Sequence, residues 1–185
     1  NHSIRAYRVE MVSIPGETHF RYNIYTHDFD NLAASTFEQS SLNATNVDLE
    51  ASFHVLGSAV VCTNLTGDGL LHTMNSQVVA DYLATTGTRH YQHSIIRARL
   101  DMVSEDTVIR NEGSYENTDT YINYGHTESY GSRLDAQHLV NHGFQYQSHS
   151  EADYHDWMQG KDGTTITNES EIHYKHKEEN GHTED

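Results

Sequence analysis

The chain has 185 residues, a formal net charge of −16 at pH 7 and 35% hydrophobic residues. A negative charge of this size disfavours electrostatic binding to nucleic acid or anionic lipid, and no apolar stretch approaches the roughly 18 residues of a membrane-spanning helix. Polar residues are mainly Asn, Ser, Thr, His and Gly, and Tyr supplies twelve of the aromatic residues. This mixture is more typical of antiparallel β structure than of a helical bundle.

The pattern of apolar residues predicts mostly strands in chain order. Residues 2–29 are expected to form a β-hairpin through the turn at Pro15 and Gly16. Residues 47–63 alternate apolar and polar side chains as a half-buried strand does. Two short helices are predicted at 73–85 and 132–142, the second ended by Gly143.

One segment occurs twice. HSIRAYRVEMVS at 2–13 and HSIIRARLDMVS at 93–104 share seven of twelve residues without a gap. Each predicts a half-buried strand with an Arg and an acidic residue on its exposed face. Strand chemistry alone could produce such a match, but the separation is close to half the chain length, which favours an internal duplication.

The duplication leads to a prediction for the whole fold. We expect an all-β, mainly antiparallel barrel or sandwich built from related halves at 1–92 and 93–177, which together form one compact domain. An acidic tail at 178–185 is expected to be solvated. Each half alone would leave one face of its strands uncovered, and the pairing of two halves would cover both.

Several features favour a secreted glycoprotein. Asn-x-Ser/Thr sites occur at Asn43, Asn64 and Asn168, with a fourth at Asn1, which is the first residue in place of a Met. A few such sites would arise by chance in a chain this rich in Asn, Ser and Thr. The single cysteine, Cys62, excludes an internal disulfide, and its apolar neighbours favour a small buried side chain over an intermolecular bridge.

Fifteen histidines raise the question of metal binding. On the helix predicted at 132–142, Asp135, His138 and His142 would share one face and could hold a divalent metal. The alternative is that histidines near a helix C-terminus are favourable through the helix dipole. No GxSxG, HExxH, CxxC, GxGxxG or Walker motif occurs, so no catalytic residue is assigned.

Tyrosines are the best candidates for ligand contact. In a cavity they would offer apolar surface together with a hydroxyl group, although ordinary cross-strand packing explains them equally well. The candidates are Tyr7, Tyr22, Tyr121, Tyr124 and Tyr146.

Three functional classes remain open. The first is a non-enzymatic carrier or storage protein that forms homo- or hetero-oligomers and holds an apolar small molecule such as a lipid or pigment. The second is a structural subunit of an extracellular filament or matrix. The third is a β-barrel enzyme or metal-binding protein that uses His and Asp.

Overall fold

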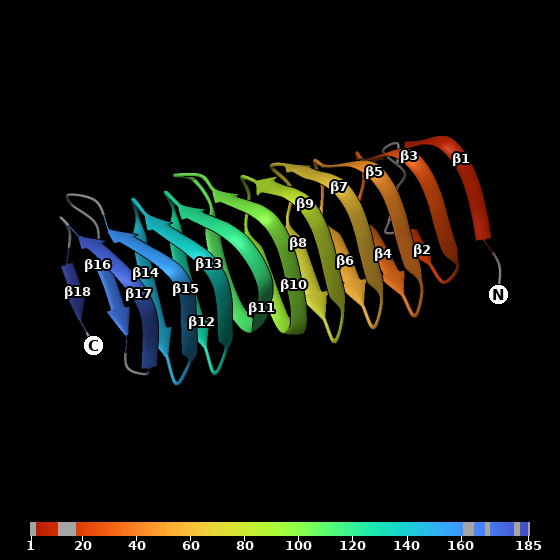
Figure 1. The fold of residues 1–185 in the computed structure, drawn as a ribbon. Helices are drawn as coiled ribbons and strands as arrows, with labels where there is room; N and C mark the ends of the chain where they lie inside the picture. Colours follow the sequence, from red (N-terminus) through yellow and green to blue (C-terminus); the bar gives the residue numbers. More distant parts are fainter. Residues whose placement is uncertain (1–2, 11–17, 161–164, 169–170, 180–181, 185) are drawn as a thin grey trace.

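The protein is a parallel β-solenoid. The computed structural model describes residues 3–10, 18–160, 165–168, 171–179 and 182–184. These residues form eighteen strands and no helix, and successive coils stack in one direction, with β1 at one end and β18 at the other (Figure 1). Each coil contains a short and a long strand that pair in parallel with their equivalents in the next coil, for example β4 with β6 and β5 with β7.

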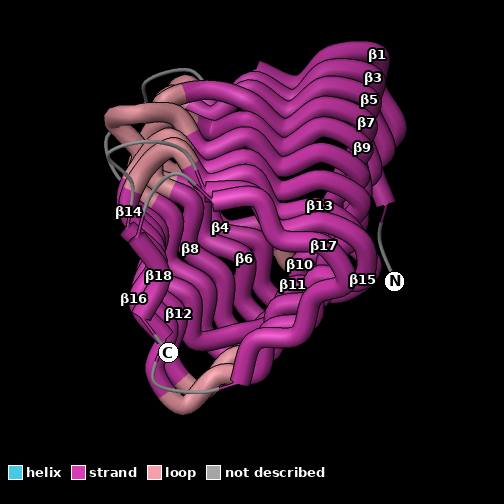
Figure 2. Tube along the Cα trace, turned by 60° about the vertical axis from the view of Figure 1, so that its left-hand side comes forward, coloured by secondary structure: helices cyan, strands magenta, loops and turns pink. Residues whose placement is uncertain are grey.

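The strands form two series, and viewed obliquely from the C-terminal end the coils repeat nearly the same path (Figure 2). The long strands are β1 (Ser3–Glu10), β3 (Asn23–Asn31), β5 (Ser41–Leu49), β7 (Ala59–Gly67), β9 (Gln77–Thr85), β13 (Arg133–Asn141), β15 (Glu151–Gly160) and β17 (Glu171–Glu179). The short strands are β2 (Thr18–Phe20), β4 (Ser35–Glu38), β6 (Phe53–Leu56), β8 (Leu71–Met74), β12 (His126–Tyr130), β14 (Phe144–Ser148), β16 (Thr165–Asn168) and β18 (His182–Glu184). β10 (Arg89–Val103) and β11 (Val108–Asn123) each run through both parts of a coil.

The predicted antiparallel barrel or sandwich is therefore wrong. The segments expected to form a hairpin at 2–29 contain β1 and β3, which pair in parallel. Alternation of apolar and polar side chains is the same in parallel and antiparallel strands, so it does not report strand direction. The return path that parallel strands require is supplied in each coil by the short strand of the opposite wall.

Both predicted helices are strands, β8 and β9 in one case and β13 in the other. The long strands bend near their middle, so buried positions follow a spacing of two, three and two residues. In β13 these positions are Leu134, Ala136, Leu139 and Asn141. The spacing of three across the bend resembles the spacing of apolar residues on a helix, which explains the error.

The repeated segment reflects an 18-residue coil and not two halves. Ile24, Leu42, Val60, Val78 and Ile96 follow one another at 18-residue steps in one inward column, and Ile4 precedes them. Ile4 is thus equivalent to Ile96, whereas the ungapped sequence match aligns it with Ile95. A shift of one residue exchanges the two faces of a strand. Asp101, expected on the exposed face, is fully buried, because the bend in β10 makes the step from buried Ala98 to the next buried position three residues long.

The interior is filled by such columns of side chains. Phe37 stacks between Phe20 and Phe53, with ring centroids 4.8 and 5.5 Å apart. Cys62 is buried in a column of small residues between Ala44 and Ala80, and burial raises the pKa of its thiol to about 12. Its burial agrees with the interpretation of Cys62 as a small buried side chain.

In six of the described coils, a residue with positive φ forms the corner between the short segment and the long segment that follows. This position is taken by Gln39, Gly57, Asn75, His93, Gly131 and His149. In several coils a serine comes next, and its hydroxyl joins adjacent coils. Ser58 Oγ accepts a hydrogen bond from the Ser40 amide at 3.0 Å, and Ser76 Oγ accepts one from the Ser58 amide at 3.1 Å.

Substitutions at Gly57 should separate backbone conformation from side-chain size. Gly57 has a φ of 55°, in the left-handed region, where β-branched residues are strained. Gly57→Val is therefore expected to lower the free energy of unfolding by about 1–2 kcal/mol. Gly57→Asn should cost clearly less, since Asn75 holds the same conformation one coil later. Urea unfolding of both variants checks this, and equal losses would contradict the assignment of the corner.

Candidate functional site

A row of imidazoles crosses the outer face of the short strands. His54 in β6, His72 in β8 and His90 in β10 occupy the same position in three consecutive coils. Their ring centroids are 5.2 and 5.4 Å apart. His54 Nδ1 lies 3.0 Å from His72 Nδ1, and His72 Nε2 lies 2.8 Å from Gln92 Oε1. This row is absent from the sequence prediction, although its 18-residue spacing is visible in the sequence.

Electrostatics keep the last imidazole of the row neutral. Partial burial and the neighbouring His72 lower the pKa of His90. The carboxylate of Glu112 raises this pKa, but it offsets only part of the decrease. Glu112 Oε1 lies 3.9 Å from His90 Nε2. His90 therefore presents an uncharged imidazole at neutral pH.

An open polar groove of about 690 Å³ lies beside the corner column. It is lined by Asn23, His93, Ile95 and residues 39–41, 57–59 and 75–77. None of these is Asp, Glu, Lys or Arg, although the chain as a whole carries a charge of −16. The hydroxyl of Ser58 already donates a hydrogen bond to the carbonyl of Leu56. The polar groups left to face the groove are mainly the side-chain amides of its Asn and Gln residues and the imidazole of His93.

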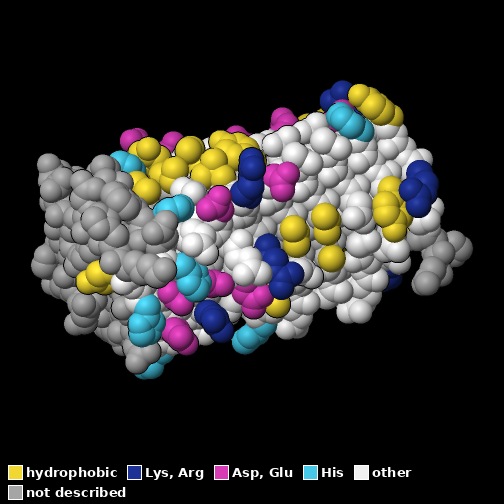
Figure 3. All heavy atoms as spheres, in the orientation of Figure 1, with side chains coloured by type: hydrophobic (Ala, Val, Ile, Leu, Met, Phe, Trp, Pro, Cys, Tyr) yellow, Lys and Arg dark blue, Asp and Glu magenta, His cyan; other side chains and the backbone are white. Residues whose placement is uncertain are grey.

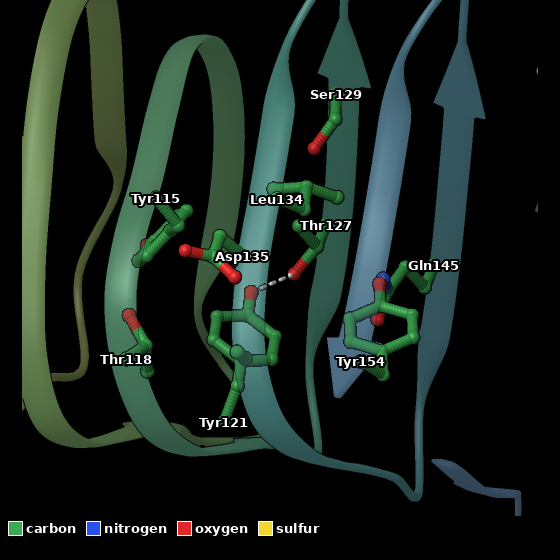
Figure 4. Close-up of a pocket in the computed structure, with 10 residues that line it drawn as sticks. Tyr115, Thr118, Tyr121, Thr127, Ser129, Leu134, Asp135, Gln145 and Tyr154 are labelled. Atoms are coloured by element: carbon green, nitrogen blue, oxygen red, sulfur yellow. Dashed lines mark hydrogen bonds between the residues drawn. The ribbon is translucent and has the colours of Figure 1, made fainter. Parts of the chain in front are cut away.

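A small cavity inside the coils is lined by tyrosines (Figure 4). Tyr121 Oη lies 3.1 Å from Thr127 Oγ1, and Tyr154 Oη accepts hydrogen bonds from the side-chain amides of Gln145 and Gln147. Burial raises the pKa of Tyr154 to about 12, so its hydroxyl stays protonated. The cavity volume is about 20 Å³, which is enough for roughly one water molecule.

The five tyrosines predicted to contact a ligand do not converge. Tyr121 alone among them lines the cavity. Tyr7 is 74% exposed and stacks on His27, and Tyr124 stacks on His142. Tyr22 contacts Phe20 edge-on, and Tyr146 lies beside Tyr130 on the outer surface.

The three residues predicted to bind metal lie along a strand and beyond its end. Asp135 and His138 belong to β13, and His142 follows it. Seven residues of extended chain span about 23 Å, so the common helix face that joined Asp135 to His142 does not exist. Asp135 instead contacts His155 and accepts a hydrogen bond from the Asn117 amide. Within the described ranges, no group of three or more His, Cys, Asp or Glu could hold a metal ion.

The predicted glycosylation sites lie in strands. Asn43 is half-buried in β5, and Asn64 is half-buried in β7, where its Nδ2 donates to Asn46 Oδ1 at 2.9 Å. Asn168 ends β16, and its side chain lies outside the described part of the structure. Glycosylation of all three remains a prediction.

Sequence reasoning also missed a buried ion pair. Arg89 Nη1 lies 2.7 Å from Asp101 Oδ1, and both side chains are fully buried. In the two preceding coils the position of Arg89 holds Leu71 and Phe53. An arginine at an otherwise apolar position of the repeat is the signal that could have revealed it.

Comparison with known proteins identified no relative. No protein-family model matches the chain, and searches of curated proteins and of solved structures found no match. Among the residues that the structure describes, no helix is long and apolar enough to cross a membrane.

Proposed function

We propose that this protein is a rod-shaped structural element of an extracellular filament or matrix. The observation that carries the proposal is the continuous parallel stack of coils. Each long strand is hydrogen-bonded to the next through most of its length, as β3 is to β5 and β5 is to β7. Such a stack is quasi-one-dimensional, so its length and stiffness depend on the number of coils.

The interior supports a structural role better than a carrier role. Ligand pockets for drug-sized molecules typically enclose several hundred Å³ within apolar walls. The tyrosine-lined cavity has about 20 Å³, and the columns of Phe, Leu, Ile and Val fill the coils that precede it.

The surface suits a protein kept in solution or in a hydrated matrix. Acidic, basic and histidine side chains lie intermixed around the middle of the face seen in Figure 3, and most of the remaining described surface in this view is uncharged. The net charge of −16 keeps separate copies apart by repulsion. The four Asn-x-Ser/Thr sites support an extracellular location.

Protein purified from its source should test the structural role directly. Native mass spectrometry is expected to give the mass of the polypeptide with its glycans and no small molecule. The absorption spectrum should contain only the bands of Tyr and Trp, and negative-stain electron microscopy should show straight rods. A lipid or pigment that copurifies in a stoichiometric amount would contradict the proposal and favour a carrier.

A further inference from the structure

The strongest unassigned feature is the contact between His54 and His72. The two Nδ1 atoms lie 3.0 Å apart. Two nitrogens bound to one metal at about 2.1 Å are roughly 3.0 Å apart for a right-angled arrangement and 3.4 Å apart for a tetrahedral one. The separation already present between the rings is therefore that of two ligands to one ion.

The hydrogen bond to Gln92 prepares His72 for coordination. Gln92 Oε1 can only accept, so His72 Nε2 carries the proton of this 2.8 Å hydrogen bond. In the neutral form of His72, Nδ1 then carries no proton and has a free lone pair. Without a metal, this lone pair accepts the hydrogen bond that His54 donates through its Nδ1 proton. Metal-binding histidines usually donate their second ring N–H to an oxygen in this way, which fixes the tautomer and orients the ring.

We propose that His54 and His72 bind one divalent transition-metal ion through their Nδ1 atoms. On binding, the proton of His54 moves from Nδ1 to Nε2, so both imidazoles remain neutral. Gln92 is a positioning residue, and water completes the coordination. Imidazole pairs favour Cu²⁺, Ni²⁺ and Zn²⁺, with Cu²⁺ the strongest, whereas Ca²⁺ and Mg²⁺ prefer oxygen ligands.

The site differs from a structural zinc centre, which has four protein ligands and closes completely. With two protein ligands, the ion should exchange with solvent and bind without being needed for folding. The proposal does not depend on the structural role of the rod, because the pair lies on the outer wall of two adjacent coils whatever the rod does.

Calorimetric titration of the full chain with Cu²⁺ tests the site. We expect one binding event per chain that is stronger than the background from other histidines. His54→Gln or His72→Gln should each weaken it at least 10-fold, and Gln92→Ala should weaken it about 10-fold or more. His149→Asn is the matched control, because His149 is exposed at the corner position that Asn75 occupies in another coil. It should leave the strong event unchanged.

Nitrogen NMR of the imidazoles during Zn²⁺ titration provides a second measurement. The Nδ1 signals of His54 and His72 should shift together, and circular dichroism should show that each variant remains folded. If His54→Gln and His72→Gln bind Cu²⁺ as His149→Asn does, the 3.0 Å contact is only a hydrogen bond and the proposal is wrong.

Discussion

Asp101→Leu is expected to lower the free energy of unfolding by about 3–5 kcal/mol, because it leaves the guanidinium of Arg89 charged and unpaired inside the solenoid. Arg89 also donates to the carbonyls of Thr85 and Met102. These neutral acceptors cannot replace the carboxylate. Urea unfolding measures the loss.

The preceding coil supplies the matched control. There the equivalents of Arg89 and Asp101 are Leu71 and Leu83. The double variant Arg89→Leu/Asp101→Leu should therefore regain the stability of the wild type or exceed it, since buried pairs replaced by apolar residues of similar volume are often neutral or stabilising. Among the described atoms, Arg89 Nε and Asp101 Oδ2 lack hydrogen-bond partners, which adds to the expected gain.

An ion pair on the surface provides a comparison for the loss of stability expected at the buried pair. Arg97 and Glu116 form a 3.0 Å ion pair with side chains 37% and 35% exposed. Arg97→Gln should cost no more than about 1 kcal/mol. If Asp101→Leu lowers the free energy of unfolding as little as Arg97→Gln does, Asp101 is not needed to compensate the buried charge of Arg89, and the prediction is wrong.

Deletion of one complete coil is expected to leave a folded protein. Removal of residues 59–76 joins Ser58 to Gln77, and Gln77 is the coil equivalent of Ala59. The inward columns then continue, with Leu42 against Val78. The rod should shorten by about 4.8 Å, the distance between neighbouring strands, and its stability should fall by roughly the contribution of one repeat.

A deletion half as long should be far more damaging. Removal of residues 59–67 eliminates β7 and leaves one coil without its long wall. The column from Leu42 to Val78 is then interrupted, and we expect loss of cooperative unfolding. Circular dichroism, urea unfolding and small-angle X-ray scattering compare the two variants. A shorter deletion that folds better than the complete one would refute the 18-residue coil.

The local character of the chain was predictable from its sequence. Alternating side chains indicate strands, and the apolar surroundings of Cys62 indicate burial. These properties depend on each residue and its near neighbours, which is why the all-β content was predicted correctly outside the two supposed helices. The bend in each long strand changes the alternation to a spacing of three, and that spacing misled the prediction at 73–85 and 132–142.

Strand direction and the meeting of distant side chains were decided only by the tertiary structure. The number of residues per coil determines which side chains stack, and it places His54 against His72. Arg89 and Asp101 belong to the same coil, and its folding brings their side chains together in the interior. Strict alternation along 93–104 placed Asp101 on the surface, whereas the bend in β10 after Ala98 turns it inward. The order of residues along the chain was enough to predict half-buried strands with buried apolar positions. The parallel stack decided which of these positions share a column, because backbone pairing between coils sets the register along the whole rod.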